Sequence, residues 1–534
     1  MDKKLLMAFV LSVVVLLTFN YYNARIAPQP GPVQEEELIT QASPQPAALL
    51  PAQEARPEIV LTAGESRVET ALFEADVNLN GGGLASFTLK EYTDKDGSLI
   101  NLVRPERQAS SLPLNSYWPE APVLIFHGDK DLSLSEGRSQ GELLLRARGE
   151  DWDVSRRLSF DNQQYLLWLE LNWENLSSQR RRLPDYYLVC TPGFGSRDKE
   201  NRQYAEVRAG IFQGDRVKTN RWKINSLVRQ LIKRSRETNI VSRLDKEIPG
   251  EVKWIAYRNK YFAVIVKPEG ETKGVLFSGL GEDEVLCRLK MPGGELEPGE
   301  KLSQRFAVYL GPVDYHQLQG LNLGFETIFD SGGLAPLRRL VMVVLRFFYR
   351  LVGNWGVAII LLTIVAKIIL LPLTQKSFRS MREMQKLQPQ ITSLRQVYKE
   401  SPQKLQKEIM DLYRRHKVNP MGGCFPMLLQ MPIFIALFTA LRSAIELRQA
   451  PFIFWIHDLS AKDPFYVLPI LMGGTMFLQQ KMTPQADPQQ ARLGMIMPIF
   501  FTFIFMNFPS GLVLYWLLNS VLSLGEQWRI KKGK

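Results

Sequence analysis

Two kinds of hydrophobic pattern divide this chain near residue 330. From about residue 60 to that point, short runs of alternating apolar and polar residues recur, as in YLLWLELNW (165–173) and RFAVYLG (305–311), separated by Gly, Asn, Asp and Pro. Alternation of this kind predicts an antiparallel β-sandwich of more than a dozen strands. Residues 224–236 depart from the pattern and fit either a short helix or a loop.

Six apolar stretches are long enough to enter a membrane. Trp355–Leu373 is the clearest of them, because about 20 apolar residues cross a hydrocarbon core of about 30 Å. Four are shorter, which fits a buried or re-entrant segment as well as a crossing through a locally thin bilayer. We interpret all six as crossings: Leu5–Phe19, Trp355–Leu373, Cys424–Leu441, Phe465–Leu478, Gly494–Phe508 and Leu512–Leu524.

Positive charge is concentrated beside these stretches. Residues 351–534 hold 21 Lys/Arg and 9 Asp/Glu, which accounts for the whole net charge of +12. Eleven of these cations lie in 375–420 and four in the tail 529–534, while Lys3 and Lys4 precede the first stretch. This distribution is positive-inside bias and does not indicate nucleic-acid binding. We therefore expect both termini in the cytoplasm and residues 24–350 outside it.

Together these patterns predict a multi-domain membrane protein with an exported antiparallel β domain, an α-helical transmembrane bundle and a cytoplasmic helical hairpin. The first stretch also fits a cleaved signal peptide, but NYYNAR offers no A-x-A-like cleavage site, which favours an uncleaved anchor. The predicted segments are a transmembrane anchor (1–23), a Pro-rich linker (24–59), the β domain (60–332), an amphipathic interfacial helix (333–352), a second span (353–374), the cytoplasmic hairpin (375–420), a third span (421–442), an outer loop (443–464), a fourth span (465–481), a cytoplasmic loop (482–493), a fifth span (494–508), a sixth span (509–525) and a basic cytoplasmic tail (526–534).

Cysteine and histidine spacing predicts no metal site, and no catalytic residue or cofactor can be singled out. Cys190 and Cys287 lie in the exported part, where a disulfide is allowed, but their separation in sequence is weak evidence for one. Cys424 opens the third span, where we expect it to be a small apolar residue.

The segment PLRRLVMVVLRFFYRLV (336–352) alternates arginines with long apolar side chains. This pattern fits an amphipathic helix on the outer membrane surface. A helix that caps the β-sandwich fits it too.

Residues 375–420 predict two helices that form an antiparallel hairpin, with Ser401-Pro402 at the start of the second. Their apolar stripes either pack only against each other or leave surface for passing hydrophobic segments, and Met381 and Met384 are adaptable enough for such contacts. The first stripe contains Phe378, Met381, Met384, Leu387, Ile391, Leu394 and Tyr398, and the second contains Leu405, Ile409, Leu412 and Tyr413.

Lys367 is the one charged residue in the six stretches. A charge at membrane depth costs at least about 2.5–3.5 kcal/mol, so it indicates function. Gly356, Thr363, Lys367 and Thr374 share one helical face. Because no stretch contains an acid, we expect Lys367 to have no ion-pair partner at its depth. This favours a hydrated cavity, although a lysine that snorkels to the interface is the alternative. Groups suited to line the cavity are Gln430, Thr439, Gln479, Gln480, Asn519, Ser520 and Ser523.

A hydrated cavity with one fixed cation would attract an acidic segment, and the basic amphipathic helices beside it would attract an apolar one. A nascent membrane protein carries both. The absence of an acid in the stretches argues against an ion-coupled transporter.

Four segments resemble the YidC/Oxa family of membrane protein insertases, in the Gram-negative form with a large exported domain. They are 352–374 (VGNWGVAIILLTIVAKIILLPLT), 418–441 (VNPMGGCFPMLLQMPIFIALFTAL), 447–482 (LRQAPFIFWIHDLSAKDPFYVLPILMGGTMFLQQKM) and 508–516 (FPSGLVLYW). The resemblance implies a non-enzymatic insertase and chaperone of the inner membrane with a hydrophilic groove. It also implies that the exported, periplasmic domain is a β-supersandwich of galactose-mutarotase-like fold.

By the same resemblance, Lys367 matches the basic groove residue, which is arginine in many relatives, and Thr363 matches a groove-lining position. Tyr515 and Trp516 fall where relatives often have two tyrosines that contact substrate. The implied partners are nascent membrane proteins, the Sec translocon, membrane lipids and, through the basic loop and tail, the ribosome. The tail after Trp528 is only RIKKGK. The alternative functions are a membrane transporter and an anchored carbohydrate-binding protein.

Overall fold

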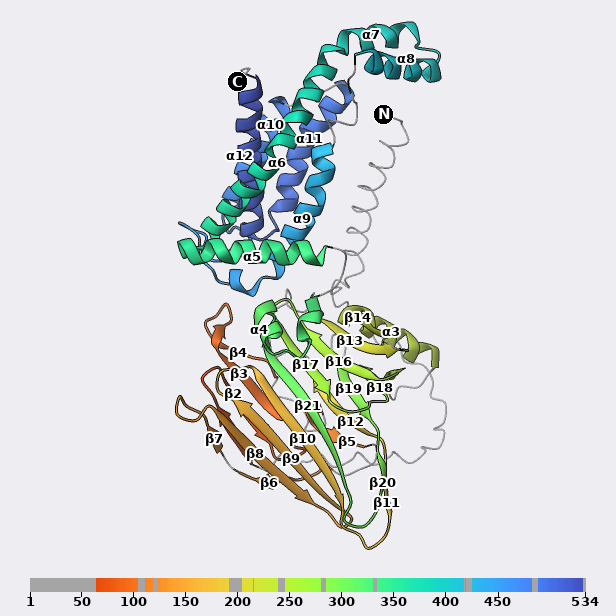
Figure 1. Cartoon of the computed structure of the whole chain (residues 1–534), viewed down its shortest axis with the longest axis vertical. Coiled ribbons are helices and arrows are strands. Elements are labelled where there is room, and N and C mark those ends of the chain that lie inside the picture. The colour runs from red at the N-terminus through yellow and green to blue at the C-terminus, as the bar shows by residue number, and fades with distance from the viewer. Residues whose placement is uncertain are drawn as a thin grey trace, which may run out of the picture. The chain divides into compact units, whose positions relative to one another are not determined.

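The computed structural model describes residues 64–103, 111–118, 123–129, 131–191, 204–214, 216–238, 245–279, 285–329, 334–416, 418, 425–482 and 488–531. The predicted anchor (1–23) and linker (24–59) lie outside these residues. Within them, a β-rich part is followed by a helical part (Figure 1).

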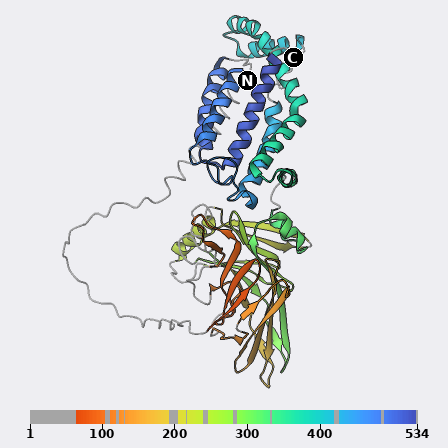
Figure 2. The same ribbon diagram turned by 90° about the vertical axis from the view of Figure 1, so that its left-hand side faces the viewer.

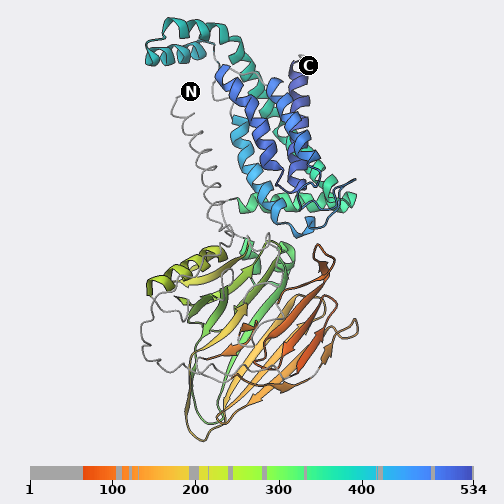
Figure 3. The same ribbon diagram turned by 180° about the vertical axis from the view of Figure 1, so that it is seen from behind.

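The strands of the β-rich part form four sheets (Figures 1 and 3). The sheet orders are β4-β3-β2-β1-β7, β14-β13-β16-β17-β21-β10-β9-β8-β6, β11-β20 and β15-β18-β19-β12-β5. Every described pairing is antiparallel except that of β1 with β7, in which Arg67 lies opposite Asp131. The strands are β1 (Glu65–Glu69), β2 (Phe73–Asn78), β3 (Leu84–Thr93), β4 (Leu99–Asn101), β5 (Ser116–Tyr117), β6 (His127–Gly128), β7 (Asp131–Ser133), β8 (Gln140–Arg148), β9 (Trp152–Asp161), β10 (Leu166–Asn175), β11 (Arg181–Leu183), β12 (Tyr186–Thr191), β13 (Glu206–Gln213), β14 (Arg216–Lys223), β15 (Asp245–Pro249), β16 (Val252–Arg258), β17 (Phe262–Pro268), β18 (Gly274–Gly279), β19 (Val285–Met291), β20 (Gly294–Leu296) and β21 (Lys301–Pro312).

Alternation of side chains explains the nine-stranded sheet. In β8 and β10 every second residue is buried, as the period of two in the sequence predicts. The last seven residues of β21 are all buried, so this strand is covered on both faces where it pairs with β17. Aromatic side chains fill the core beside it; Trp173 is fully buried and Phe73 stacks on Phe87 at 4.4 Å.

A buried arginine closes the GGG turn at residues 81–83. Arg156 has no exposed surface, and its Nη1 donates to the carbonyls of Gly81, at 2.9 Å, and Gly82. Its Nη2 donates to the carbonyl of Leu114 and lies 3.3 Å from Ser116 Oγ. Burial lowers the pKa of the Arg156 guanidinium to about 9. The carbonyls therefore replace water around this cation, and the turn depends on it.

Except for α3, the described helices begin at residue 315 or later (Figures 1 and 2). Residues 224–236, whose sequence fits either a short helix or a loop, are helical. The helices are α3 (Ile224–Thr238), α4 (Tyr315–Gly320), η2 (Phe325–Phe329), α5 (Ala335–Val352), α6 (Trp355–Lys386), α7 (Gln388–Val397), α8 (Pro402–Arg415), α9 (Phe425–Ser443), η4 (Ile445–Leu447), α10 (Val467–Met482), α11 (Pro488–Phe505) and α12 (Ser510–Lys531).

Helix α5 is amphipathic. Its buried residues Val341 and Leu345 belong to the helical core, which also contains residues of α6, α9 and α12. The side chains of Leu340, Phe347 and Leu351 are more than half exposed. This apolar outer face is the one expected of a helix that lies on a membrane surface.

The first stripe of the predicted hairpin belongs to two helices instead of one. Helix α6 continues past Thr374 to Lys386, and α7 starts at Gln388. Pro389 explains the break, because it has no N–H to donate to the preceding turn and its ring clashes with the carbonyl four residues earlier. Helices α7 and α8 contact each other, and the buried Met384, Leu387 and Ile391 lie along the first stripe.

Among the described residues, α6 alone is long and apolar enough to cross a membrane, and Gly494–Phe505 is a shorter apolar helical segment. Six crossings remain a prediction.

Candidate functional site

The site around Lys367 joins helices α6 and α12, which pack side by side. Lys367 Nζ donates to Ser523 Oγ at 2.8 Å and lies 3.3 Å from Glu526 Oε2. The other carboxylate oxygen, Glu526 Oε1, lies 2.5 Å from Thr374 Oγ1. One carboxylate of α12 therefore contacts two residues of α6 that stand seven positions apart.

The expectation that Lys367 has no acidic partner is wrong. It assumed that the sixth helix ends near residue 525, with Glu526 in a tail. Helix α12 instead continues to Lys531 and places Glu526 three residues after Ser523, on the same face. The apolar run ends at Leu524 and is followed by Gly525, which can end a helix, but GEQW contains no proline to stop one. The absence of a proline was the signal by which Glu526 could have been found.

Burial makes this ion pair energetically important. The side chain of Glu526 is 4% exposed and that of Lys367 is 12% exposed. Taking two charges out of water is costly, and each charge stays buried only because the other compensates it. Ser523 Oγ accepts from Lys367 while it donates to the carbonyl of Asn519 at 2.8 Å, so the hydroxyl fits between cation and backbone.

The rest of the polar stripe on α6 faces protein. Thr363 is 1% exposed and its hydroxyl donates to the carbonyl of Ile359 at 2.6 Å. A Cβ at Gly356 would overlap the ring of Phe452. The hydroxyl of Thr363 therefore bonds within its own helix, and the polar contacts described between this stripe and α12 are those of Lys367 and Thr374.

A second polar contact joins α9 to α12. Gln430 Nε2 donates to Tyr515 Oη at 2.8 Å, and Tyr515 is 2% exposed. Trp516 packs edge-on against Phe434 at 4.7 Å and lies 5.2 Å from Phe505. The predicted substrate-contact pair is thus part of the packing between helices. Ser520 is 3% exposed and Asn519 is partly buried.

The hairpin residues proposed for substrate contact differ in their surroundings. Met384 is 8% exposed, and the side chain of Met381 lies outside the described residues. The apolar side chains that α7 and α8 do expose are Val397, at 73%, and Met410, at 42%. Sequence periodicity did not single out these two for substrate contact.

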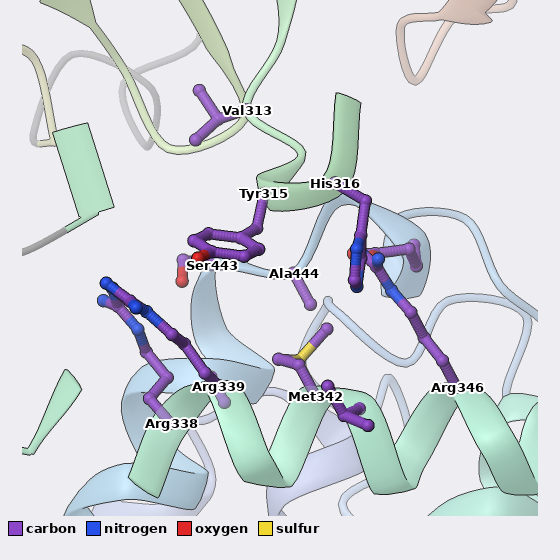
Figure 4. Close-up of a pocket in the computed structure, with 12 residues that line it drawn as sticks. Val313, Tyr315, His316, Arg338, Arg339, Met342, Arg346, Ser443 and Ala444 are labelled. Carbon is purple, nitrogen blue, oxygen red and sulfur yellow. The ribbon is translucent and has the colours of Figure 1, made fainter. Parts of the chain in front are cut away.

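A cavity lies between α5, the end of α9 and the turn before α4 (Figure 4). On one side of the cavity, Arg346 donates from Nη2 to Asp314 at 3.0 Å and from Nε to Glu446 at 2.9 Å. Arg338 and Arg339 extend together on the other side, and the Arg339 guanidinium lies 5.1 Å from the centre of the Tyr315 ring. Sequence analysis did not single out Asp314 or Glu446.

Across the described ranges, no three His, Cys, Asp or Glu side chains lie close enough together to hold a metal ion.

Two family models match the chain. The model described as 60Kd inner membrane protein matches residues 347–534, and the model described as YidC periplasmic domain matches residues 65–344.

Known proteins match over the full length. The membrane protein insertase YidC of Geotalea daltonii is 35% identical over 559 aligned residues, which cover 100% of this chain and 99% of the relative. The membrane protein insertase YidC of Syntrophus aciditrophicus is 35% identical over 567, covering 100% of both. A crystal structure of an active YidC insertase with its first transmembrane domain resolved covers 87% of this chain and 92% of its own, at 20% identity and a TM-score of 0.37.

Proposed function

Because the chain belongs to the YidC family of membrane protein insertases, we propose that it inserts nascent proteins into the inner membrane with Lys367 as the cation that receives their acidic segments. The buried contact between Lys367 and Glu526 carries this proposal. The ion pair lies near the end of the apolar part of α6. Its acidic partner is a carboxylate, and an acidic segment of a client presents the same group. No covalent catalysis is required.

The mechanism is an exchange of counter-ions. At rest, Glu526 compensates Lys367, so the cation avoids the cost of an unpaired charge among apolar helices. When an acidic segment of a client arrives, its carboxylate replaces Glu526 at the ammonium. The four-carbon stem of lysine lets the ammonium turn toward the new partner. Thr374, 2.5 Å from Glu526, keeps a hydrogen bond available to the displaced carboxylate.

The client must then leave. Once its acidic segment has crossed, the Lys367 ammonium pairs with Glu526 again. Since Glu526 is always near, it limits the time that a client acid stays bound. A groove that holds a cation with a resident competitor therefore binds acidic segments transiently. In this proposal Asn519, Ser520, Thr363 and Gln430 belong to the groove wall. Tyr515 and Trp516 contact the client's apolar helix once it parts α9 from α12, because Tyr515 is buried between these helices.

The orientation and the partners are also part of the proposal. We place both termini and the hairpin in the cytoplasm and the β domain in the periplasm, in agreement with the charge distribution. The hairpin and the tail would meet the ribosome, α5 would meet membrane lipids, and the Sec translocon would deliver some clients.

The test compares two neutral variants in reconstituted vesicles. Lys367→Gln and Glu526→Gln each remove one charge from the same ion pair at similar side-chain size. The client is a single-span protein with an acidic translocated tail, and its protease-protected fraction is measured. Loss of the Lys367 charge should lower insertion about tenfold or more, because hydrogen bonds to charged groups contribute about 1.5–3 kcal/mol. Glu526→Gln should leave insertion within about twofold of the unchanged chain, because the client's acid keeps its cation.

A second client controls for folding. It is the same protein with its tail acids changed to amides, and Lys367→Gln should insert it as well as the unchanged chain does. Lys367→Arg should support both clients. Equal losses for Lys367→Gln and Glu526→Gln, or equal losses for both clients, would show that the ion pair only stabilises the bundle.

The transporter alternative loses one of its counter-arguments, because Glu526 supplies the buried acid that the sequence stretches lack. The membership of the whole chain in the insertase family is now the argument against a transporter.

A further inference from the structure

Cys190 on β12 and Cys287 on β19 are neighbours across one antiparallel ladder. Leu188 pairs with Leu289, and moving two residues along each strand from that pair leads to Cys190 and Cys287. Side chains two residues apart point to the same face of a sheet. A bulge between Val189 and Thr191 shifts the register by one residue, so that Cys287 pairs with Thr191 and Cys190 is the bulged residue next to that pair.

The two side chains share the core of the β-rich part. Cys190 is 3% exposed and Cys287 is fully buried. Both are free thiols in this structure, and the thiol of Cys190 lies 3.9 Å from the carbonyl of Leu188. Burial, with a smaller contribution from Cys190, raises the pKa of the Cys287 thiol. In the folded domain the reactive thiolate is therefore disfavoured and shielded from any protein-sized oxidant.

We propose that Cys190 and Cys287 are the site of a disulfide that forms while the exported domain folds, before β12 and β19 are covered. The ladder brings the two strands together, and Cys190, at the bulge, is next to the Thr191–Cys287 pair in the same hydrophobic core. Adjacent antiparallel strands hold their Cα atoms within the range that a disulfide spans. The oxidant is a disulfide of the exported compartment, carried by a protein or a small thiol compound.

The exchange balances in two steps. The thiolate of one cysteine attacks the oxidant's disulfide, forms a mixed disulfide and releases one oxidant thiol. The thiolate of the other cysteine attacks the protein sulfur of that mixed disulfide, forms the Cys190–Cys287 bond and releases the second thiol. The cysteines lose two electrons and two protons, and the oxidant's disulfide is reduced to two thiols.

The bond would close a loop that contains the residues from Thr191 to Leu286, including β13, β14 and β15–β18. Closing so long a loop restricts the unfolded chain strongly. It would also secure the β12–β19 ladder in the middle of the sheet β15-β18-β19-β12-β5. The disulfide is therefore a stabilising cross-link of the exported domain.

The test traps thiols in the full chain directly from cells. Cells are quenched in acid, the chain is denatured, free thiols are blocked with one maleimide, and reduction then exposes linked cysteines to a second, heavier maleimide. Two cysteines should take the heavier label, and peptide mass spectrometry of the unreduced chain should show Cys190 joined to Cys287. The variant Cys424→Ser should give the same result. Both cysteines blocked before reduction, or either of them joined to Cys424, would overturn the proposal.

A second measurement tests whether the cross-link stabilises the folded chain. Purified chain is unfolded by heat with and without a thiol reductant. The reductant should lower the unfolding midpoint of the unchanged chain and of Cys424→Ser by several degrees, and should not change that of Cys190→Ser/Cys287→Ser. An unchanged chain whose midpoint does not respond to the reductant would contradict a stabilising cross-link.

Discussion

Thr374 on α6 and Lys367, seven residues before it, contact opposite oxygens of the same carboxylate, Glu526. Seven residues of helix span about 10 Å. The Lys367 side chain must therefore extend along α6 toward Thr374 to reach that carboxylate. This is the direction expected of a snorkelling lysine, but here the ammonium ends at a buried acid and a serine hydroxyl rather than in water.

Removal of Glu526 should destabilise the helical part. Glu526→Ala leaves the buried Lys367 without its counter-charge, and breaking a buried ion pair from one side costs about 3–5 kcal/mol. We expect a lower thermal midpoint in detergent. The matched control is Glu383→Ala, which breaks an exposed pair with Lys386 on the same helix α6 and should change the midpoint little. Equal midpoints for the two variants would contradict the role of burial.

Substitution by valine should change the stability of the chain by different amounts at the two threonines of the polar stripe. Thr374→Val removes the hydroxyl beside Glu526 and should cost about 1–3 kcal/mol, because a buried charged acceptor loses a donor. Thr363→Val removes a hydroxyl that bonds only within its own helix, so stability should change by less than about 1 kcal/mol. Denaturant unfolding of both variants measures the difference. A larger loss for Thr363→Val would mean that its hydroxyl has a partner outside α6.

The contact between Gln430 and Tyr515 should appear as a coupling energy. Tyr515→Phe and Gln430→Met each remove one side of a hydrogen bond between α9 and α12. Each single change should destabilise the chain by about 1 kcal/mol, and the double change should cost less than their sum. A double-mutant cycle on thermal stability measures this, and strict additivity would argue that the hydrogen bond contributes nothing.

The glycine turn of the β-rich part should tolerate no side chain. Gly82 has a positive φ of 66°, and a Cβ there would overlap the Arg156 side chain, which donates to its carbonyl. Gly214, with a φ of 61°, has nothing within 4 Å of its Cβ position. Gly214→Ala should therefore cost about 1–2 kcal/mol for the backbone conformation alone. Gly82→Ala should cost clearly more, measured by thermal unfolding, and equal costs would show that Arg156 moves aside freely.

Local periodicity was sufficient for much of the fold. Alternation in segments such as 165–173 predicted strands, and apolar runs such as 355–373 predicted helices, because each pattern reports which side of an element is buried. The same reasoning identified Lys367 as the charge that needs explaining. It missed the division of the hairpin's first stripe at Leu387 and the length of α12, because a helix ends where capping and packing decide, and hydrophobicity reports neither.

The sequence by itself determined that a single lysine lies within an apolar helical segment and that threonines share its face of the helix. Tertiary structure alone decided that Glu526 pairs with it. The physical reason is that an ion pair between α6 and α12 depends on how two helices pack, and residues so far apart in the chain share no local pattern. The same holds for Cys190 and Cys287, whose proximity follows from the register of β12 against β19 and not from their spacing.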